Sequence, residues 1–204
     1  MKKLLFIAAI SLGVVVSANA QDTKIGAKAG INLANMTGDD VEDADMLIGF
    51  QVGGYVHLGL SDAFAIQPEL LFEMKGASYD AGDDESVSTN LSYISIPILA
   101  KYMITEELDV HLGPQIGLLM SAETDGEDVS DFYKSTDFGL AVGAGYELES
   151  GLNFSLRYAM SLSTIGEDFE ESFVNPLTGE TETMTFEAGD IKNSVITIAV
   201  GYSF

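Results

Sequence analysis

The sequence predicts an all-β protein: a closed, eight-stranded, antiparallel up-and-down transmembrane β-barrel of the outer-membrane type, preceded by a cleaved signal peptide. Three observations favour this fold. Eight stretches alternate apolar with small or polar residues at the period of a strand. These stretches are longer than the ~5–6 residues of a soluble strand and reach the ~9–11 residues that a tilted membrane strand needs. Long acidic connections alternate with very short turns, as in barrels that have extracellular loops and periplasmic turns.

The N-terminus has the pattern of an export signal. Lys2 and Lys3 precede an apolar run over residues 4–16, and Ala18-Asn19-Ala20 has the small-x-small pattern of a signal peptidase site. The apolar run is shorter than the ~20 residues of a spanning helix. We therefore expect residues 1–20 to be the signal peptide and residues 21–204 to form one outer-membrane β-barrel domain.

Composition argues against several classes of protein. The 204 residues carry a formal net charge of −23, and loss of residues 1–20 removes two of the nine basic residues. Nucleic acid is not expected as a partner, because phosphate contacts need Lys and Arg. A hydrophobic content of 47% is too high for a disordered chain. The lack of cysteine excludes disulfides and thiolate metal sites.

The first four predicted strands cover residues 24–36, 46–60, 64–76 and 91–104. Their apolar faces include Ile25, Ile31 and Leu33; Ile48, Phe50 and Val52; Phe64, Ile66 and Leu70; and Ile94, Ile96 and Ile98. The second strand has Gly49, Gly53 and Gly59 on its other face, and glycine suits a crowded barrel interior better than a sheet face in water. Residues 61–63 form a tight turn, whereas acidic loops cover residues 37–45 and 77–90.

The last four predicted strands cover residues 108–120, 137–148, 152–163 and 195–204. Short turns occupy residues 105–107 and 149–151, and long loops occupy residues 121–136 and 164–189. Four long loops and three short turns give an even strand number and place both termini on the periplasmic side. The final strand then pairs with the first, because hydrocarbon does not tolerate an open sheet edge. An aromatic girdle is expected near the periplasmic ends, made of Phe64, Tyr102, Tyr146, Phe154, Tyr202 and Phe204.

Several strand patterns resemble a known family. They are SYISIPILAKY at 92–102, HLGPQIGLLM at 111–120, DFGLAVGAGYEL at 137–148, NFSLRYAMSLS at 153–163 and the VGYSF end. Together they resemble the PorT-like outer-membrane β-barrel domain common in Bacteroidota. The resemblance implies a monomeric-type barrel inserted by the barrel-assembly machinery, which reads a C-terminal strand ending in an aromatic residue, here Tyr202 and Phe204. Some members of that family are accessory to protein secretion, and most have no assigned activity.

Charged residues fall at positions that point into the predicted barrel. The inward cations are Lys28, Lys75, Lys101 and Arg157, and the inward anions are Glu69, Glu73, Asp109 and Glu147. A buried charge is costly unless it is paired. Near the periplasmic strand ends we expect an interior charge plug made of Glu69, Lys101, Asp109, Glu147 and Arg157. A proton or ion path is the alternative interpretation.

Metal and catalytic sites receive little support. His57 and His111 point inward on strands that do not follow one another, and no third ligand is spaced to join them, so interior hydrogen bonding is the favoured interpretation. The loops contain no histidine for a Ser-His-Asp arrangement. Weak Ca²⁺ binding is the alternative to plain solvation for four acidic loop groups: Asp39, Asp40, Glu42, Asp43 and Asp45; Asp80, Asp83, Asp84 and Glu85; Glu123, Asp125, Glu127, Asp128 and Asp131; and Glu167, Asp168, Glu170 and Glu171.

These features predict a non-enzymatic outer-membrane barrel with a structural or interaction role and no cofactor. Expected contacts are outer-membrane lipid, the assembly machinery and an extracellular or periplasmic protein. Two other classes stay open. One is a narrow small-solute channel, which an eight-stranded barrel filled by side chains disfavours. The other is a lipid-modifying enzyme, which would need a surface site of His with Ser or a carboxylate.

Overall fold

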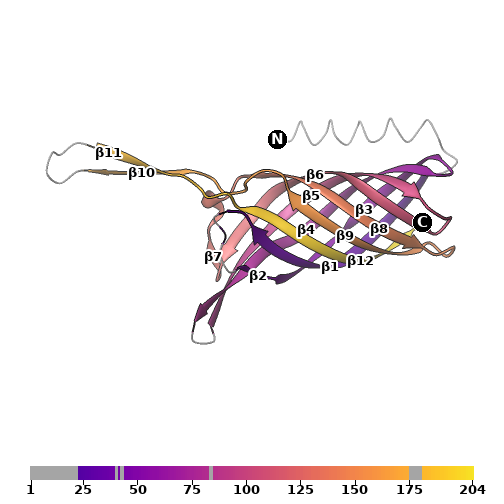
Figure 1. The fold of residues 1–204 in the computed structure, drawn as a ribbon, viewed down its shortest axis with the longest axis horizontal. Coiled ribbons are helices and arrows are strands. Elements are labelled where there is room, and N and C mark those ends of the chain that lie inside the picture. Colours follow the sequence, from indigo (N-terminus) through magenta and orange to yellow (C-terminus); the bar gives the residue numbers. More distant parts are fainter. Residues whose placement is uncertain (1–22, 40, 42–43, 83–84, 175–180) are drawn as a thin grey trace.

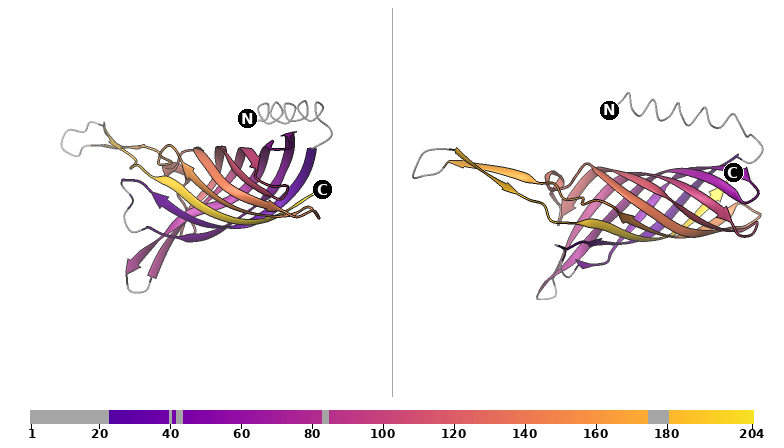
Figure 2. Two further views of the ribbon diagram at one scale, coloured as in Figure 1. Left: turned by 45° about the vertical axis from the view of Figure 1, so that its right-hand side comes forward. Right: turned by 45° about the horizontal axis from the view of Figure 1, so that its top comes forward.

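A closed β-barrel forms the body of the molecule. The computed structural model describes residues 23–39, 41, 44–82, 85–174 and 181–204, so the predicted signal peptide lies outside the described residues. Antiparallel barrel strands run obliquely around a long axis (Figure 1 and Figure 2). The eight strands are β1 (Thr23–Thr37), β3 (Leu47–Ser61), β4 (Phe64–Gly82), β5 (Glu85–Met103), β6 (Leu108–Thr124), β8 (Thr136–Glu147), β9 (Leu152–Ser161) and β12 (Lys192–Ser203). The predicted fold class is confirmed.

The first and last strands close the ring, as predicted. β1 pairs with β12 over a register that runs from Gly26 opposite Ser203 to Thr37 opposite Lys192. The other barrel strands pair in chain order, and the β4–β5 pairing completes the circle. Closure leaves the wall without an open sheet edge, which a hydrocarbon environment would not tolerate.

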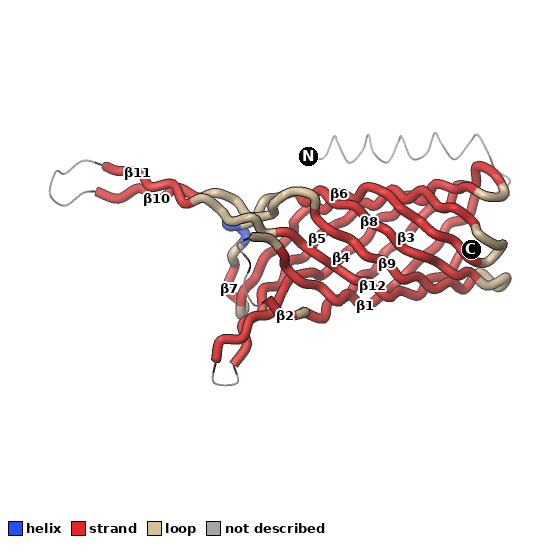
Figure 3. The backbone as a smooth tube through the Cα atoms, in the orientation of Figure 1, coloured by secondary structure: helices blue, strands red, loops and turns tan. Residues whose placement is uncertain are grey.

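The two ends of the barrel differ. Short turns after β3, β5 and β8 lie at one end together with the C-terminus, and we name it the short-turn end (Figure 1). The opposite, long-loop end has β2 (Ala44–Asp45), β7 (Glu127–Asp128), the 3₁₀ helix η1 (Ser130–Phe132), β10 (Phe169–Val174) and β11 (Thr181–Phe186). The hairpin of β10 and β11 extends away from the barrel at this end (Figure 3). Among the described residues, no helix is long and apolar enough to cross a membrane.

All four predicted long loops contain some strand, and two of them form long hairpins. The predicted loop at residues 77–90 is largely a continuation of β4 and β5, which pair from Gly76 opposite Asn90 to Gly82 opposite Glu85. The predicted loop at residues 164–189 contains the β10–β11 hairpin. Acidic and small residues made both segments look like loops, whereas cross-strand pairing and residues such as Val87 and Thr185 favour strands.

Alternation along the strands separates an apolar outer wall from a polar interior. Large side chains such as Ile48, Leu70, Leu112 and Ile198 are exposed on the outer wall, where lipid is the solvent. Aromatic rings gather at the short-turn end. The Phe64 and Tyr102 rings lie 5.1 Å apart and the Tyr202 and Phe204 rings 5.2 Å apart. These pairs occupy the position predicted for a girdle.

A small apolar core fills the long-loop end, which the sequence reasoning missed. Its buried members are Met36, Ala77, Leu91, Tyr93, Ala122 and Ile165. Ile165 comes from the segment after β9 and is held by its backbone. Its N–H donates to Ile191 O at 2.7 Å, and its carbonyl accepts from Lys134 N at 2.8 Å. The interior therefore changes from ionic near the short turns to apolar at the long loops.

Candidate functional site

Glu69 is the centre of the larger interior charge group. Its carboxylate accepts hydrogen bonds from Arg157 Nη1 and Nη2 at 2.8 and 2.9 Å and from Gln67 Nε2 at 2.7 Å. The Lys28 ammonium lies 3.3 Å away. All four side chains are buried. Because β4, β9 and β1 do not neighbour one another in the ring, this group joins three walls of the lumen.

Asp109 is the centre of a second group on β5 and β6. Its Oδ2 lies 3.0 Å from Lys101 Nζ, and its Oδ1 lies 2.8 Å from His111 Nδ1. Lys101 also donates to Gln67 at 3.3 Å, which connects this group to that of Glu69. Glycine on the adjacent strand β8 makes room for the side chains. A Cβ at Gly143 would lie 2.6 Å from His111 Nε2.

Glu147 lies at the barrel mouth. Its side chain is 23% exposed and pairs with Lys24 at 2.6 Å, and it accepts a hydrogen bond from Ser203 Oγ at 3.0 Å. The Ser203 hydroxyl also contacts Tyr55 Oη at 2.9 Å. The predicted five residues are thus divided: Glu69 with Arg157, Lys101 with Asp109, and Glu147 with a lysine outside the predicted set.

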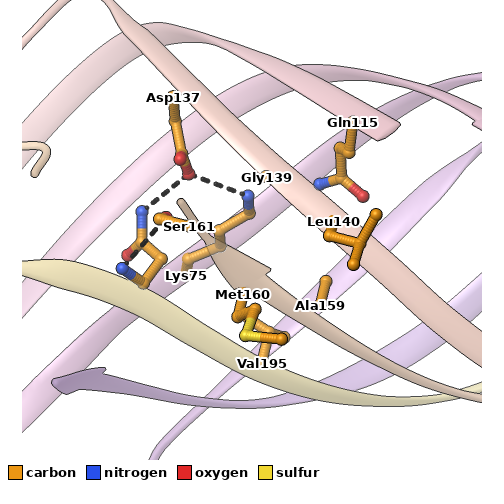
Figure 4. Close-up of a pocket in the computed structure, with 10 residues that line it drawn as sticks. Lys75, Gln115, Asp137, Gly139, Leu140, Ala159, Met160, Ser161 and Val195 are labelled. Atoms are coloured by element: carbon orange, nitrogen blue, oxygen red, sulfur yellow. Dashed lines mark hydrogen bonds and ion pairs between the residues drawn. The ribbon is translucent and has the colours of Figure 1, made fainter. Parts of the chain in front are cut away.

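A third charge group lies nearer the long-loop end. Lys75 Nζ is 3.4 Å from Glu73 and 3.5 Å from Asp137, and it lies 4.8 Å from the centre of the Tyr93 ring. Figure 4 shows the Lys75 ammonium pointing toward the Asp137 carboxylate. Asn193 also donates to Asp137, at 3.0 Å. Sequence reasoning placed Lys75 and Glu73 inside but left Asp137 out of the charge set. The signal for Asp137 was its alternation with the inward glycines of β8.

The buried charges balance. Within the described chain they are the cations Lys28, Lys75, Lys101 and Arg157 and the anions Glu69, Glu73, Asp109 and Asp137. Ser95 and Gln115 donate to Glu73 at 2.6 and 3.1 Å and add hydrogen bonds to the third charge group. Pairing and additional hydrogen bonds are what make buried charges tolerable.

Little free space remains between these side chains. A cavity of about 10 Å³ is lined by residues that include Lys75, Asp137 and Asn193, and one of about 20 Å³ by residues that include Lys28 and Arg157. Each is about the size of one or two water molecules. Oxygen atoms of Gln115, Asp137 and Asn193, three residues that line the first cavity, have no protein hydrogen-bond partner.

The described histidines and acidic loop residues are not arranged as a metal centre. His57 lies on β3 and His111 on β6, and these strands do not pair. Within the described ranges, no group of three or more His, Asp or Glu residues has the arrangement of a metal site. Asp40, Glu42, Asp43, Asp83 and Asp84 lie outside the described residues.

The C-terminal aromatic residues lie at the seam of the barrel. The Phe204 N–H donates to Ile25 O at 2.8 Å, so the last residue still contacts β1. Its ring is 79% exposed beside that of Tyr202.

The fold and its filled, charged interior define an eight-stranded membrane barrel. The chain belongs to the family described as outer membrane protein beta-barrel domain, whose model matches residues 19–166. A comparison with curated proteins gives no match.

Solved structures share the fold at low sequence identity. Neisserial surface protein A is 13% identical with a TM-score of 0.54, covering 89% of this chain and 97% of that one. Ail, the attachment invasion locus protein of Yersinia pestis, in complex with the heparin analogue sucrose octasulfate, is 12% identical with a TM-score of 0.51, covering 90% and 100%. A major outer membrane protein of Thermus thermophilus is 14% identical with a TM-score of 0.51, covering 90% and 100%.

Proposed function

We propose that this chain is a non-enzymatic outer-membrane barrel that binds a partner through its long-loop end, while its interior charge network is structural. The observation that carries the proposal is the contrast between the lumen and that end. The lumen is packed with paired charges and closed by the apolar core around Ile165. The long-loop end instead extends strands beyond the wall and exposes aromatic and acidic side chains.

The packed lumen favours this function over a solute channel. Arg157 and Glu69 belong to β9 and β4, which stand opposite each other in the ring of eight strands. Their ion pair therefore crosses the diameter of the barrel. Moving a solute past it would leave buried charges without partners, which costs about 3–5 kcal/mol for each broken pair.

The proposed orientation places the long-loop end at the cell surface and both termini in the periplasm. It rests on the general architecture of these barrels, in which periplasmic turns are short and extracellular loops are long. Outer-membrane lipid would contact the exposed apolar wall. The barrel-assembly machinery would read the final strand through Tyr202 and Phe204, and Phe204 extends the pairing with β1.

Two structural relatives give a precedent for a surface role. One is named a surface protein, and the other an attachment invasion locus protein. The ligand of the second is polysulfated, whereas the loops of this chain are acidic, so a partner of different charge is expected. A secretion-accessory role, as the PorT-like resemblance implies, is a special case of the same function.

Site-specific photocrosslinking in intact cells tests the proposal. A photoreactive amino acid at exposed Asp125 or Thr185, both at the long-loop end, is expected to trap a partner. The same group at exposed Ser150, in a short turn, serves as the matched control. The orientation would be overturned if a membrane-impermeant thiol reagent, applied to intact cells, labelled the Ser150→Cys variant and not the Asp125→Cys variant. The lack of any adduct at either long-loop position would overturn the interaction role.

A further inference from the structure

Three exposed aromatic rings form a cluster where the β10–β11 hairpin leaves the barrel. Phe132 ends η1, Phe169 begins β10 and Phe186 ends β11. The Phe132 and Phe169 rings meet edge to face at 5.2 Å, and the Phe169 and Phe186 rings stack at 4.7 Å with planes 9° apart. Each residue is between 39% and 47% exposed. We name these three rings the aromatic cluster.

The cluster is held in place by backbone contacts. Glu167 N donates to Phe132 O at 2.9 Å, and Tyr133 forms an isolated bridge with Gly166. These contacts join η1 to the base of the hairpin. The hairpin extends away from the barrel wall (Figure 1 and Figure 2), and the three rings come from η1 and from the base of the hairpin, not from the eight wall strands. Exposed aromatic groups arranged in this way indicate an interaction site.

Carboxylates surround the cluster. Asp131, Glu167 and Glu187 are exposed and lie within two positions of a ring along the chain. Residues 162–191 contain eight acidic residues and no Lys, Arg or His. Aromatic faces attract cations, and carboxylates form charge-assisted hydrogen bonds with Arg and Lys. The same charge repels polyanions, and it repels a second copy of this segment.

The hairpin also offers strand edges. β10 and β11 form a two-stranded sheet with Phe169 opposite Phe186, and within the described part of the chain neither pairs with another strand. An unpaired edge can add an extended segment through main-chain hydrogen bonds. In such a complex alternate side chains of the added strand face the same side of the sheet.

We propose that the β10–β11 hairpin and the aromatic cluster bind an extended, cationic polypeptide segment. Its Arg or Lys side chains stack on Phe132, Phe169 and Phe186 and pair with the flanking carboxylates, while its backbone pairs with a free edge of the hairpin. The inference rests on the proposed interaction function and names its site and the chemistry of its partner.

Peptide binding to the purified, folded barrel in lipid nanodiscs tests this. The probe is a fluorescent eight-residue peptide that alternates Arg and Val. A peptide of the same composition and charge in which each valine is D-valine cannot add as a regular strand, because a residue of opposite chirality does not favour the strand backbone of its L neighbours. We expect the first peptide to bind at least tenfold more tightly, with affinity falling as salt rises. Equal binding of the two peptides would overturn strand addition.

Two variants test the cluster and its charges. Phe169→Leu with Phe186→Leu keeps apolar bulk but removes two π faces, and we expect about fivefold weaker binding or more. Glu167→Gln with Glu187→Gln should weaken binding, whereas Glu106→Gln with Glu149→Gln, the same charge change at the short-turn end, should not. Equal losses in the two Gln pairs would overturn the site.

Other occupants have their own signatures. Binding of an alternating Glu and Val peptide or of sucrose octasulfate in place of the Arg peptide would overturn the cationic assignment. If the barrel formed dimers and Phe169→Leu with Phe186→Leu abolished them, the occupant of the site would be a second copy of this chain, and the cationic assignment would again be overturned. If the Arg and Val peptide did not bind but Asp125 still gave a photocrosslink, only the cationic-segment proposal would be overturned. If no long-loop position gave a crosslink, the proposed interaction function would be overturned as well.

Discussion

Arg157 and Glu69 are joined by two hydrogen bonds across the full diameter of the barrel. The Nη1–Oε2 and Nη2–Oε1 distances are 2.8 and 2.9 Å, and the two strands that carry the residues stand opposite each other in the ring. Both side chains are buried, and Lys28 adds a second cation to the same carboxylate. The pair thus ties two walls together and occupies the centre of the lumen.

Arg157→Ala should destabilise the barrel by about 3–5 kcal/mol, because it leaves a buried carboxylate with one cation in place of two. The measurement is the urea midpoint followed by the gel-mobility difference between folded and boiled protein. Lys192→Ala, which removes the partly exposed pair with Asp190, should change stability by no more than about 1 kcal/mol. Similar effects of the two substitutions would contradict a structural role for the cross-lumen pair.

Arg157→Ala should not open a conducting pore. The apolar core around Met36, Leu91 and Ile165 fills the long-loop end, and Arg157 is not one of its members. In planar bilayers we expect no steady single-channel current from the wild type or from the variant. A stable ohmic conductance from the wild type would instead favour the channel interpretation.

Gly26→Ala tests how tightly the interior is packed. Gly26 lies opposite Tyr55 on β3, and a Cβ there would enter the Tyr55 ring. Overpacking of this kind costs about 1–3 kcal/mol. Gly54→Ala on β3 is the matched control, because its Cβ would approach only the Gly26 carbonyl oxygen, at 3.3 Å. The urea midpoint of Gly26→Ala should be lower than that of Gly54→Ala. In a Tyr55→Ala background, Gly26→Ala should lower the midpoint by less.

The barrel was predictable because its signals are local. Period-two alternation defines each strand and its lipid-facing side, and loop lengths define the strand order. Interior contacts depend instead on the relative height of residues on tilted strands, which alternation does not give. Arg157 and Glu69 lie 88 positions apart and meet, whereas Glu147 was expected in the same plug and pairs with Lys24 at the mouth.

The long-loop end was less predictable for a different reason. Acidic, small-residue segments usually form solvated loops, and composition alone does not reveal that residues 169–174 and 181–186 pair as a hairpin. Ile165 was likewise assigned to a loop, although it is fully buried in the core that closes the barrel. The proximity of Phe132 to Phe169 depends on both features.

Deletion of Phe204 should slow assembly more than it lowers stability. Its ring is largely exposed and its backbone adds one hydrogen bond to Ile25, so its loss costs the finished barrel about 1 kcal/mol. In cells, the folded fraction on unboiled gels should fall while the urea midpoint of refolded protein changes little. Phe154→Leu, at the same aromatic girdle, is the control and should leave assembly unchanged. If Phe154→Leu lost as much folded protein as the Phe204 deletion, Phe204 would act in membrane anchoring and not as an assembly signal. If the Phe204 deletion lowered the urea midpoint as much as Arg157→Ala does, Phe204 would act in barrel closure.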